Sequence, residues 1–460
     1  MNPGFSHTDR ADAPARWWVA ILCLVQPILD ALSHWMGPLP HGGTITLGLR
    51  MLLLLGTVAL AYLLSENKKA YWLTALALTL YWLCHALACV RVGYRSPMED
   101  FINFSRVAQI PVLTLCLITL LRRIDEPVRL LETVLTATLY LIAAITLIAL
   151  VTKTTVWSYV RWKVGLSGWF DLPNSQSAIY GVLTAVTVFA ALARGDWLHA
   201  SIRCCVGDIL LYHLGTRLAY AEIFGIAAAA VIAMLLTRRF DRRAAAALLL
   251  LAAVCAVFYG RSPMAANQRL YAESVAEQQA AADSANETQP LDALYETYLS
   301  AMVDRFGMEA VKEVYHESRD IAVIGDVRLY KINYCRMVMQ SLPATSRLFG
   351  FELAQTRHQN SIFDVENDFH GIYFLFGVCG LVLLISYLLY FAVRALLGML
   401  QRPADCLTMW VLGFGLAAVI LIGNAYFSAS VLRRPNASFY LSLALAALWL
   451  LTERREERLT

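Results

Sequence analysis

Repeated apolar runs, each about as long as a bilayer is thick, limit this chain to one kind of fold. A helix needs about 20 apolar residues to cross the bilayer core. We count about twelve such runs, at residues 17–36, 45–64, 70–90, 106–121, 130–151, 177–193, 200–214, 218–236, 244–260, 371–393, 407–424 and 437–452. Only 16% of the chain is charged and 58% is hydrophobic. The sequence therefore predicts an all-α, polytopic membrane bundle with about twelve transmembrane helices, and it excludes a soluble enzyme.

Lysine and arginine residues beside these runs predict the orientation. Basic loops favour the cytoplasmic side. If the chain has twelve spans, one side receives most of the basic flanks, namely Arg10, Arg16, Lys68, Lys69, Arg122, Arg123, Arg194, Arg238, Arg239, Arg242, Arg243, Arg394, Arg402, Arg454, Arg455 and Arg458. Losing one span before the end would break this pattern. We therefore expect both termini to be cytoplasmic, and a net charge of +4 gives no sign of nucleic-acid binding.

With this orientation, the long polar segment at residues 261–369 lies on the extracytoplasmic side. It is the only extramembrane segment long enough to fold. Apolar residues from Leu291 to Phe306 recur at helical spacing, which indicates an amphipathic helix. A second helix is expected from Asp326 to about Leu342. We divide the chain into spans one to nine, the extracytoplasmic loop and spans ten to twelve, at residues 1–260, 261–369 and 370–460.

The loops predicted to lie outside the cell also carry many basic residues, although basic residues favour cytoplasmic loops. These residues are Arg91, Arg95, Arg106, Arg161, Lys163, Arg328, Lys331, Arg336, Arg433 and Arg434. A strongly anionic substrate such as a lipid-linked pyrophosphate would explain them, because arginine binds phosphate oxygens in pairs. The alternative is pairing with loop carboxylates. Within the spans, Asp30 and His34 are expected to form a polar pair on one helix face, and Arg50 to extend outward.

The turn between the seventh and eighth runs carries the first motif. Gly215 permits a sharp turn, and Thr216 is expected to cap the eighth helix. Arg217 then projects from a helix N-terminus, which favours anions. Glu222 lies about one turn deeper and is expected to orient Arg217. The alternative is an arginine that only anchors the turn at the membrane edge.

Two further motifs lie in and after the loop. Arg328 and Lys331 share a helix face, with Arg336 adjacent, so this face is either a phosphate site or a solvated surface. The ionisable residues Glu366, Asp368 and His370 gather with Asn367 where the tenth span begins. Their alternative role is helix capping. A weaker signal is Pro173-Asn174 before the sixth span, which predicts a turn and a cap.

These motifs, in this order, resemble the O-antigen ligase/polymerase superfamily of bacterial cell-surface polysaccharide enzymes. The resemblance covers about residues 17–452. The matching residues are Gln26, Pro27, Asp30, Pro173, Asn174, Arg217, Gly225, Arg328, Pro343, Gly350, Glu366, Asn367, Gly377 and Gly380. Ligases that decorate lipid A carry a catalytic histidine where this chain has Glu366. That departure favours a polymerase, or a ligase that uses another acceptor.

The resemblance implies a membrane glycosyltransferase of the bacterial cytoplasmic membrane. It would move a glycan from a polyprenyl-pyrophosphate donor onto an acceptor sugar or cell-envelope hydroxyl at the outer face, using no nucleotide sugar. The expected roles are pyrophosphate binding by Arg217, Arg328, Lys331 and Arg336, base catalysis by Glu366 or else Asp368 or His370, and support from Glu222, Asn367 and Asn174. A raised pKa would suit Glu366 as base. No acidic cluster suggests a metal, so we expect a metal-independent reaction without a cofactor, and inversion at the anomeric carbon.

Two other classes of protein compete with this interpretation. A transporter or flippase of lipid-linked oligosaccharide also fits twelve spans, but such proteins often contain two similar halves. The halves of this chain do not resemble each other, and its charges gather near the outer face. A non-catalytic partner of an export complex is the third hypothesis. Mutating Arg217, Arg328 and Glu366 would discriminate, because such a partner should survive loss of the arginines.

Overall fold

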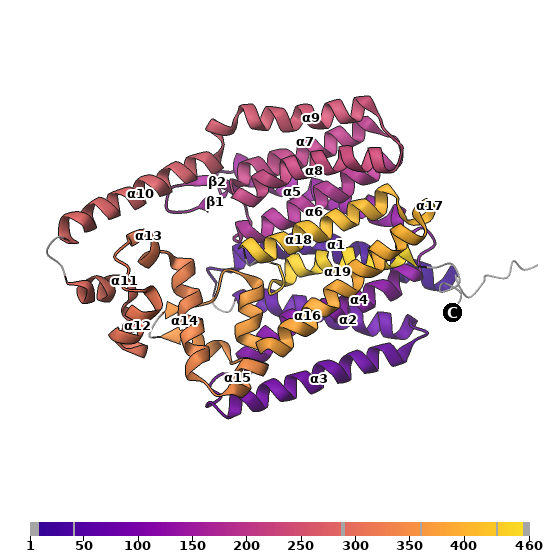
Figure 1. Cartoon of the computed structure of the whole chain (residues 1–460). Coiled ribbons are helices and arrows are strands. Elements are labelled where there is room, and N and C mark those ends of the chain that lie inside the picture. The colour runs from indigo at the N-terminus through magenta and orange to yellow at the C-terminus, as the bar shows by residue number, and fades with distance from the viewer. Residues whose placement is uncertain (1–8, 40–41, 287–289, 359–360, 429–430, 454–460) are drawn as a thin grey trace, which may run out of the picture.

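Twelve long helices form the bundle, each at the position of a predicted apolar run (Figure 1). The computed structural model describes residues 9–39, 42–286, 290–358, 361–428 and 431–453. The twelve helices are α1 Asp9–Met36, α2 Gly42–Leu64, α3 Lys68–Val90, α4 Pro97–Arg122, α5 Pro127–Val151, α6 Pro173–Ala193, α7 Trp197–Leu214, α8 Arg217–Leu236, α9 Arg242–Val257, α16 Asp368–Gln401, α18 Met409–Ser428 and α19 Pro435–Thr452. The short helix α17, Pro403–Cys406, joins α16 to α18. The prediction of an all-α polytopic membrane bundle is confirmed.

Ten of these helices are long and apolar enough to cross a membrane, so the chain is a multi-pass membrane protein. The exceptions are α7 and α9. Helix α9 has only 16 residues, and α7 carries Arg203, whose guanidinium is buried against Glu132 of α5 (Nη1 to Oε1, 3.1 Å). Both helices nevertheless pack in the bundle, where α7 lies between α6 and α9. The count of about twelve spans stays a prediction.

The two ends of the described chain lie at the same end of the bundle. The backbone N–H of Asp125 donates to Asp12 (3.3 Å), and Arg122 pairs with Glu453. The helices of the long polar segment extend from the opposite end (Figure 1). This arrangement agrees with an even number of crossings. The tail arginines used to predict orientation, Arg454, Arg455 and Arg458, lie outside the described residues, and the orientation stays a prediction.

The polar segment is helical and has a core of its own. Its elements are η1 Tyr259–Arg261, α10 Pro263–Asn286, α11 Leu291–Phe306, α12 Met308–Tyr315, α13 Ile321–Ile324, α14 Val327–Ser341, α15 Ala344–Phe349, η2 Leu353–Thr356, and the paired strands β3 Arg357–His358 and β4 Ser361–Ile362. Helices α11 and α14 confirm the two predicted helices. Leu299 and Met302 of α11 are buried with Tyr334 of α14 and with Phe363. The domain boundaries stay a prediction.

An antiparallel hairpin that the sequence did not predict lies at the same end as this segment (Figure 1). Its strands are β1 Val156–Tyr159 and β2 Val164–Gly168. Gly165 has a φ of +76°, and a Cβ there would lie 2.7 Å from the carbonyl oxygen of Leu214. The hairpin therefore packs directly on the turn between α7 and α8.

Helix α16 is broken where α15 crosses it. Gly377 has a φ of +65° inside α16, and Gly350 has a φ of +84° just after α15. A Cβ on Gly350 would collide with the carbonyl of Leu375, and a Cβ on Gly377 would collide with the backbone of Leu348. Both glycines are required because two backbones touch here and both residues have left-handed φ values.

A polar cluster around Asp30 joins four helices near the end of the bundle from which the polar segment extends. Asp30 of α1 accepts hydrogen bonds from Arg50 of α2 (2.5 Å), Gln176 of α6 (3.3 Å) and Asn436 of α19 (3.1 Å). Arg50 therefore turns inward to Asp30 instead of extending outward as predicted. The expected Asp30–His34 pair is also wrong, because the His34 ring bonds to Asp171 (2.7 Å). The Arg50 guanidinium suits Asp30 because hydrogen bonds between charged groups are stronger than those between neutral groups.

Candidate functional site

The turn between α7 and α8 presents Arg217. Gly215 ends α7 with a left-handed φ of +76°. The Thr216 hydroxyl caps α8 by accepting from the N–H of Ala219 (3.2 Å). Both features confirm the predicted turn. Arg217 is the first residue of α8, is exposed, and makes no hydrogen bond or ion pair with any residue that the structure describes. Its guanidinium is therefore available to a ligand, beside the N–H groups of a helix N-terminus.

Glu222 is buried as expected but faces away from Arg217. The amide of Asn424 in α18 donates to its Oε1 atom (2.6 Å). Its carboxylate lies against Gly181 of α6, where any Cβ would collide with it. Five helical residues rotate a side chain by about 140° around the axis, so Glu222 and Arg217 project to different sides. The expected contact between them is not formed, and Glu222 instead ties α8 to α6 and α18.

Tyr159 at the end of β1 lies within electrostatic reach of both Arg217 and Arg328. Burial raises the pKa of the Tyr159 hydroxyl, and the positive charges of Arg217 and Arg328 both act to lower it. The two arginines, from α8 and α14, are thus close enough to the same phenol to influence its ionisation. Tyr159 was not among the predicted site residues, because a half-buried tyrosine in a four-residue strand forms no recognisable sequence pattern.

The basic face of α14 holds Glu366. Asp326 caps this helix by accepting from the N–H groups of Arg328 (2.8 Å) and Leu329 (3.3 Å). The Nε atom of Arg328 then donates to Oε2 of Glu366 (3.2 Å), and Nζ of Lys331 donates to Oε1 (2.8 Å). Three residues predicted for the site therefore form one cluster. Pairing with a loop carboxylate, the alternative for these cations, is also observed.

The pKa of Glu366 is lowered, whereas a raised pKa would suit a base. Burial acts to raise it, but the hydrogen bond from Lys331 and the charges of Lys331 and Arg328 outweigh burial, so the net pKa lies below the ordinary value. Two cations favour the charged form more strongly than partial burial opposes it. Glu366 is consequently a carboxylate at neutral pH, with a side chain that is 39% exposed.

Asn367 and Asp368 hold the start of α16. Asn367 caps the helix, accepting from the N–H of His370 (3.0 Å) and donating to the carbonyl of Tyr426 (2.7 Å). Asp368 is fully buried and accepts from the N–H groups of Val431 (2.9 Å) and Leu432 (2.8 Å). The Nε atom of Arg433 donates to its other oxygen (3.1 Å). The capping alternative is thus observed for Asn367, and the contacts of Asp368 are those of a residue that positions this loop.

His370 and Arg336 line a cavity of about 570 Å³. It is lined by parts of α14, α15 and α16, and Arg347 of α15 also borders it. Its apolar side includes Phe369, Tyr373 and Leu381. Neither Arg336 nor Arg347 bonds or pairs with another of the described residues. The structure therefore separates Arg336 from Arg328 and Lys331, since five residues on α14 turn its side chain away from Lys331.

Asn174 does not have the predicted capping role. Helix α6 begins at Pro173, its N-cap position is Leu172, and no side chain of the described residues caps it. Pro173 needs no capping partner because proline has no backbone N–H. Asn174 is the second residue of α6, and among the described residues no hydrogen bond or ion pair joins it to Glu366, Arg328 or Lys331.

One group of described residues is close enough to hold a metal ion. It consists of His85, Cys89 and Asp100, from α3 and α4, and it shares no member with the residues predicted for the site. These residues lie on two helices and include only one cysteine, so they form no recognisable metal-binding spacing along the sequence.

The comparisons with known proteins identify the family. No curated protein matches the chain. The family model described as O-antigen ligase like membrane protein matches residues 16–454, which is nearly the whole chain. The chain therefore belongs to the O-antigen ligase-like membrane protein family and is a membrane enzyme of polysaccharide assembly.

Proposed function

We propose that this protein transfers a glycan from a polyprenyl pyrophosphate to an acceptor sugar hydroxyl, as a polysaccharide polymerase or ligase. The reaction would take place at the outer face of the bacterial cytoplasmic membrane, with both termini in the cytoplasm. The observation that carries this proposal is the ion-paired cluster of Arg328, Lys331 and Glu366, with the positive charges of Arg217 and Arg328 both acting on Tyr159. Fixed cations next to a carboxylate are what transfer from a pyrophosphate leaving group requires.

The cations have the roles of binding and stabilising the pyrophosphate. Negative charge grows on the leaving pyrophosphate as its bond to the sugar breaks, and preorganised donors stabilise it. Arg217 has no competing partner among the described residues. Arg328 uses only its Nε atom on Glu366, so both terminal nitrogens of its guanidinium remain as donors. Neither role needs a metal, and we propose a metal-independent reaction.

Glu366 is the proposed base, and the donor itself would activate it. In the free protein Lys331 and Arg328 hold its pKa low, which makes it a weak base. A bound pyrophosphate would draw these cations toward its own oxygens and place negative charge near the carboxylate. Both changes raise a carboxylate pKa. Glu366 would then accept the proton of the attacking hydroxyl, and we expect inversion at the anomeric carbon.

The 570 Å³ cavity beside His370 is the proposed place for the acceptor. It borders the start of α16, two residues after Glu366, and its cations Arg336 and Arg347, which have no partner among the described residues, suit an anionic acceptor. The aromatic wall of Phe369 and Tyr373 offers flat surfaces to a sugar or a lipid chain. His370 would contact the acceptor here, either as the base in place of Glu366 or as a hydrogen-bonding group.

Turnover of a defined donor tests the proposal. Purified protein in liposomes would be incubated with a polyprenyl-pyrophosphate oligosaccharide, and the glycan products separated on a gel. Longer glycans should form with the wild type and with the controls Arg243→Ala and Glu296→Gln, which alter exposed residues elsewhere. They should be lost in Arg217→Ala and Glu366→Gln. Movement of the intact lipid between leaflets without any product would instead support the transporter hypothesis.

A further inference from the structure

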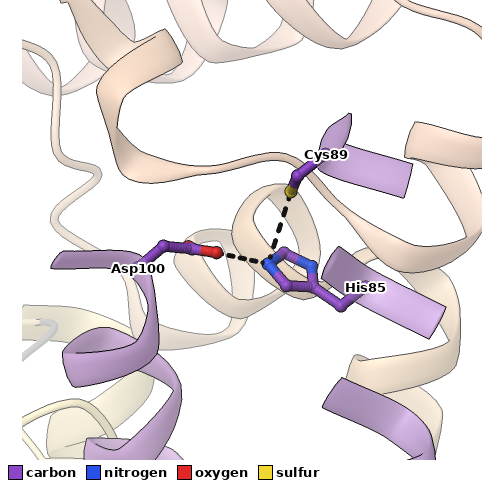
Figure 2. A group of neighbouring side chains, drawn as sticks. All are labelled: His85, Cys89 and Asp100. Carbon is purple, nitrogen blue, oxygen red and sulfur yellow. Dashed lines mark hydrogen bonds and ion pairs between the residues drawn. The ribbon is translucent and has the colours of Figure 1, made fainter. Parts of the chain in front are cut away.

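Three metal-binding side chains meet between the outer end of α3 and the start of α4. His85 and Cys89 lie one turn apart on α3, and Asp100 lies in the first turn of α4 (Figure 2). His85 Nε2 is 2.8 Å from Oδ2 of Asp100 and 3.5 Å from Sγ of Cys89. One ligand atom from each residue lies within 4.8 Å of the other two. This spacing is close to that of ligand atoms around one transition-metal ion.

The trio is buried and its charges are incompletely satisfied. His85 and Cys89 are 0% exposed and Asp100 is 1% exposed. The rings of Trp82 and Phe376 each pack 5.4 Å from the His85 ring. The Oδ1 atom of Asp100 is buried without any hydrogen-bond partner among the described residues. Leaving a carboxylate oxygen unpartnered in an apolar site is costly, and a bound cation would satisfy it.

His85 is oriented as a metal ligand would be. Its Nδ1 atom lies 2.6 Å from the carbonyl oxygen of Phe349. A carbonyl only accepts, so Nδ1 carries a proton and Nε2 is the atom turned toward Cys89 and Asp100. Metal-bound histidines usually donate their other ring N–H to such a partner. The hydroxyl of Tyr94 donates to Oδ2 of Asp100 (2.7 Å), which supports the second ligand in the same way.

We propose that His85, Cys89 and Asp100 bind a zinc ion. Zinc accepts nitrogen, sulfur and oxygen ligands together, and water would complete its tetrahedron. Without the ion, the groups that fit this geometry are an imidazolium, a thiol and a carboxylate. Binding Zn²⁺ replaces one proton on Nε2 of His85 and one on Sγ of Cys89, and releases both to solvent. The net charge of the buried site is then the same before and after binding.

The ion would fix α15 in place and has no part in glycosyl transfer. Phe349, whose carbonyl binds His85, is the last residue of α15. Just beyond it Gly350 touches the break in α16, where the hydroxyl of Tyr81 on α3 donates to the carbonyl of Phe376 (2.5 Å). Helix α15 also carries Arg347 of the proposed acceptor cavity. A metal here would hold that wall of the cavity rigid.

Metal content and a spectroscopic signature test this proposal on the full chain in detergent. Wild-type protein exposed to Zn²⁺ and passed through a desalting column should retain about one zinc per chain by mass spectrometry. Replacing zinc with Co²⁺ should give a sulfur-to-cobalt charge-transfer band in the near ultraviolet. Both signals should disappear in Cys89→Ser and Asp100→Asn. They should persist in Cys84→Ser, which alters an exposed cysteine of the same helix.

The wild-type measurements decide the question even if a variant fails to fold. Wild-type protein that retains no metal, shows no cobalt–sulfur band and has the same Tm with and without Zn²⁺ would overturn the proposal. The trio would then be a His85–Asp100 ion pair beside a thiol. A cobalt band that survives Cys89→Ser would overturn it too. None of these readouts depends on glycosyl transfer, so failure of the proposed function would leave this result unaffected.

Discussion

We predict that Asp368 stabilises the fold and does not act as the catalytic base. Its side chain is fully buried and accepts the N–H groups of Val431 and Leu432 together with Nε of Arg433. Asp368→Ala removes all three interactions and leaves two buried N–H groups unpaired. Arg433 keeps Asp364 and a backbone carbonyl as partners. Breaking a buried pair of this kind costs about 3–5 kcal/mol.

Thermal unfolding in detergent measures this effect. Unfolding entropies near 2.1 cal/mol/K per residue give roughly 1 kcal/mol per degree for a chain of 460 residues. Asp368→Ala should therefore lower Tm by about 3–5 °C. The matched control is Asp364→Asn, which alters the half-exposed partner of the same arginine and should change Tm by no more than about 1 °C. An unchanged Tm in Asp368→Ala, combined with lost transfer, would refute this reasoning and restore Asp368 as a candidate base.

Three further predictions follow from the geometry. Gly377→Ala, at a φ of +65° and against a neighbouring backbone, should lower Tm clearly, whereas Gly423→Ala, with nothing within 4 Å of the new methyl group, should not. Asp30→Ala leaves the Arg50 guanidinium, which is only 15% exposed, without its carboxylate and with only the Gln26 amide oxygen as a partner among the described residues; it should cost about 3–5 kcal/mol, measured by the same thermal unfolding. The folded-state pKa of Glu366 is depressed, so its stabilisation is present above the unfolded pKa and is lost as pH falls through the folded pKa. Because this side chain is 39% exposed, the loss should be under about 1 kcal/mol and absent in Glu366→Gln, as acid-limb unfolding curves would detect.

Local sequence signals predicted much of this structure. Apolar runs of bilayer length located the bundle helices, and the spacing of Leu294 and Met302 located α11. Gly215 and Thr216 marked the turn before Arg217, because a left-handed glycine and a hydroxyl cap act within a few residues. These features depend on neighbours along the chain, so a single sequence is sufficient to identify them.

Long-range partners were not predictable in the same way. Glu222 was expected to contact Arg217, but it bonds to Asn424, which is 202 positions away. Arg433 was counted among cations for a substrate, yet it is occupied by Asp368. Such pairs depend on which helices become neighbours, and residue spacing contains no information on this. For the same reason the contact between His85 and Asp100, which lie on different helices, was not predicted.

Donor turnover by arginine variants tests the central claim most directly. The assay would measure the free polyprenyl pyrophosphate released and the glycan transferred, under conditions that give kcat/KM for the donor. Losing one preorganised donor to a developing negative charge typically costs about 100- to 1,000-fold in rate. We predict a loss of that size in Arg217→Ala, equal release and transfer in the wild type, and unchanged rates in Arg243→Ala. Transfer by Arg217→Ala within about two-fold of the wild type would contradict the proposed role of this arginine in stabilising the leaving pyrophosphate.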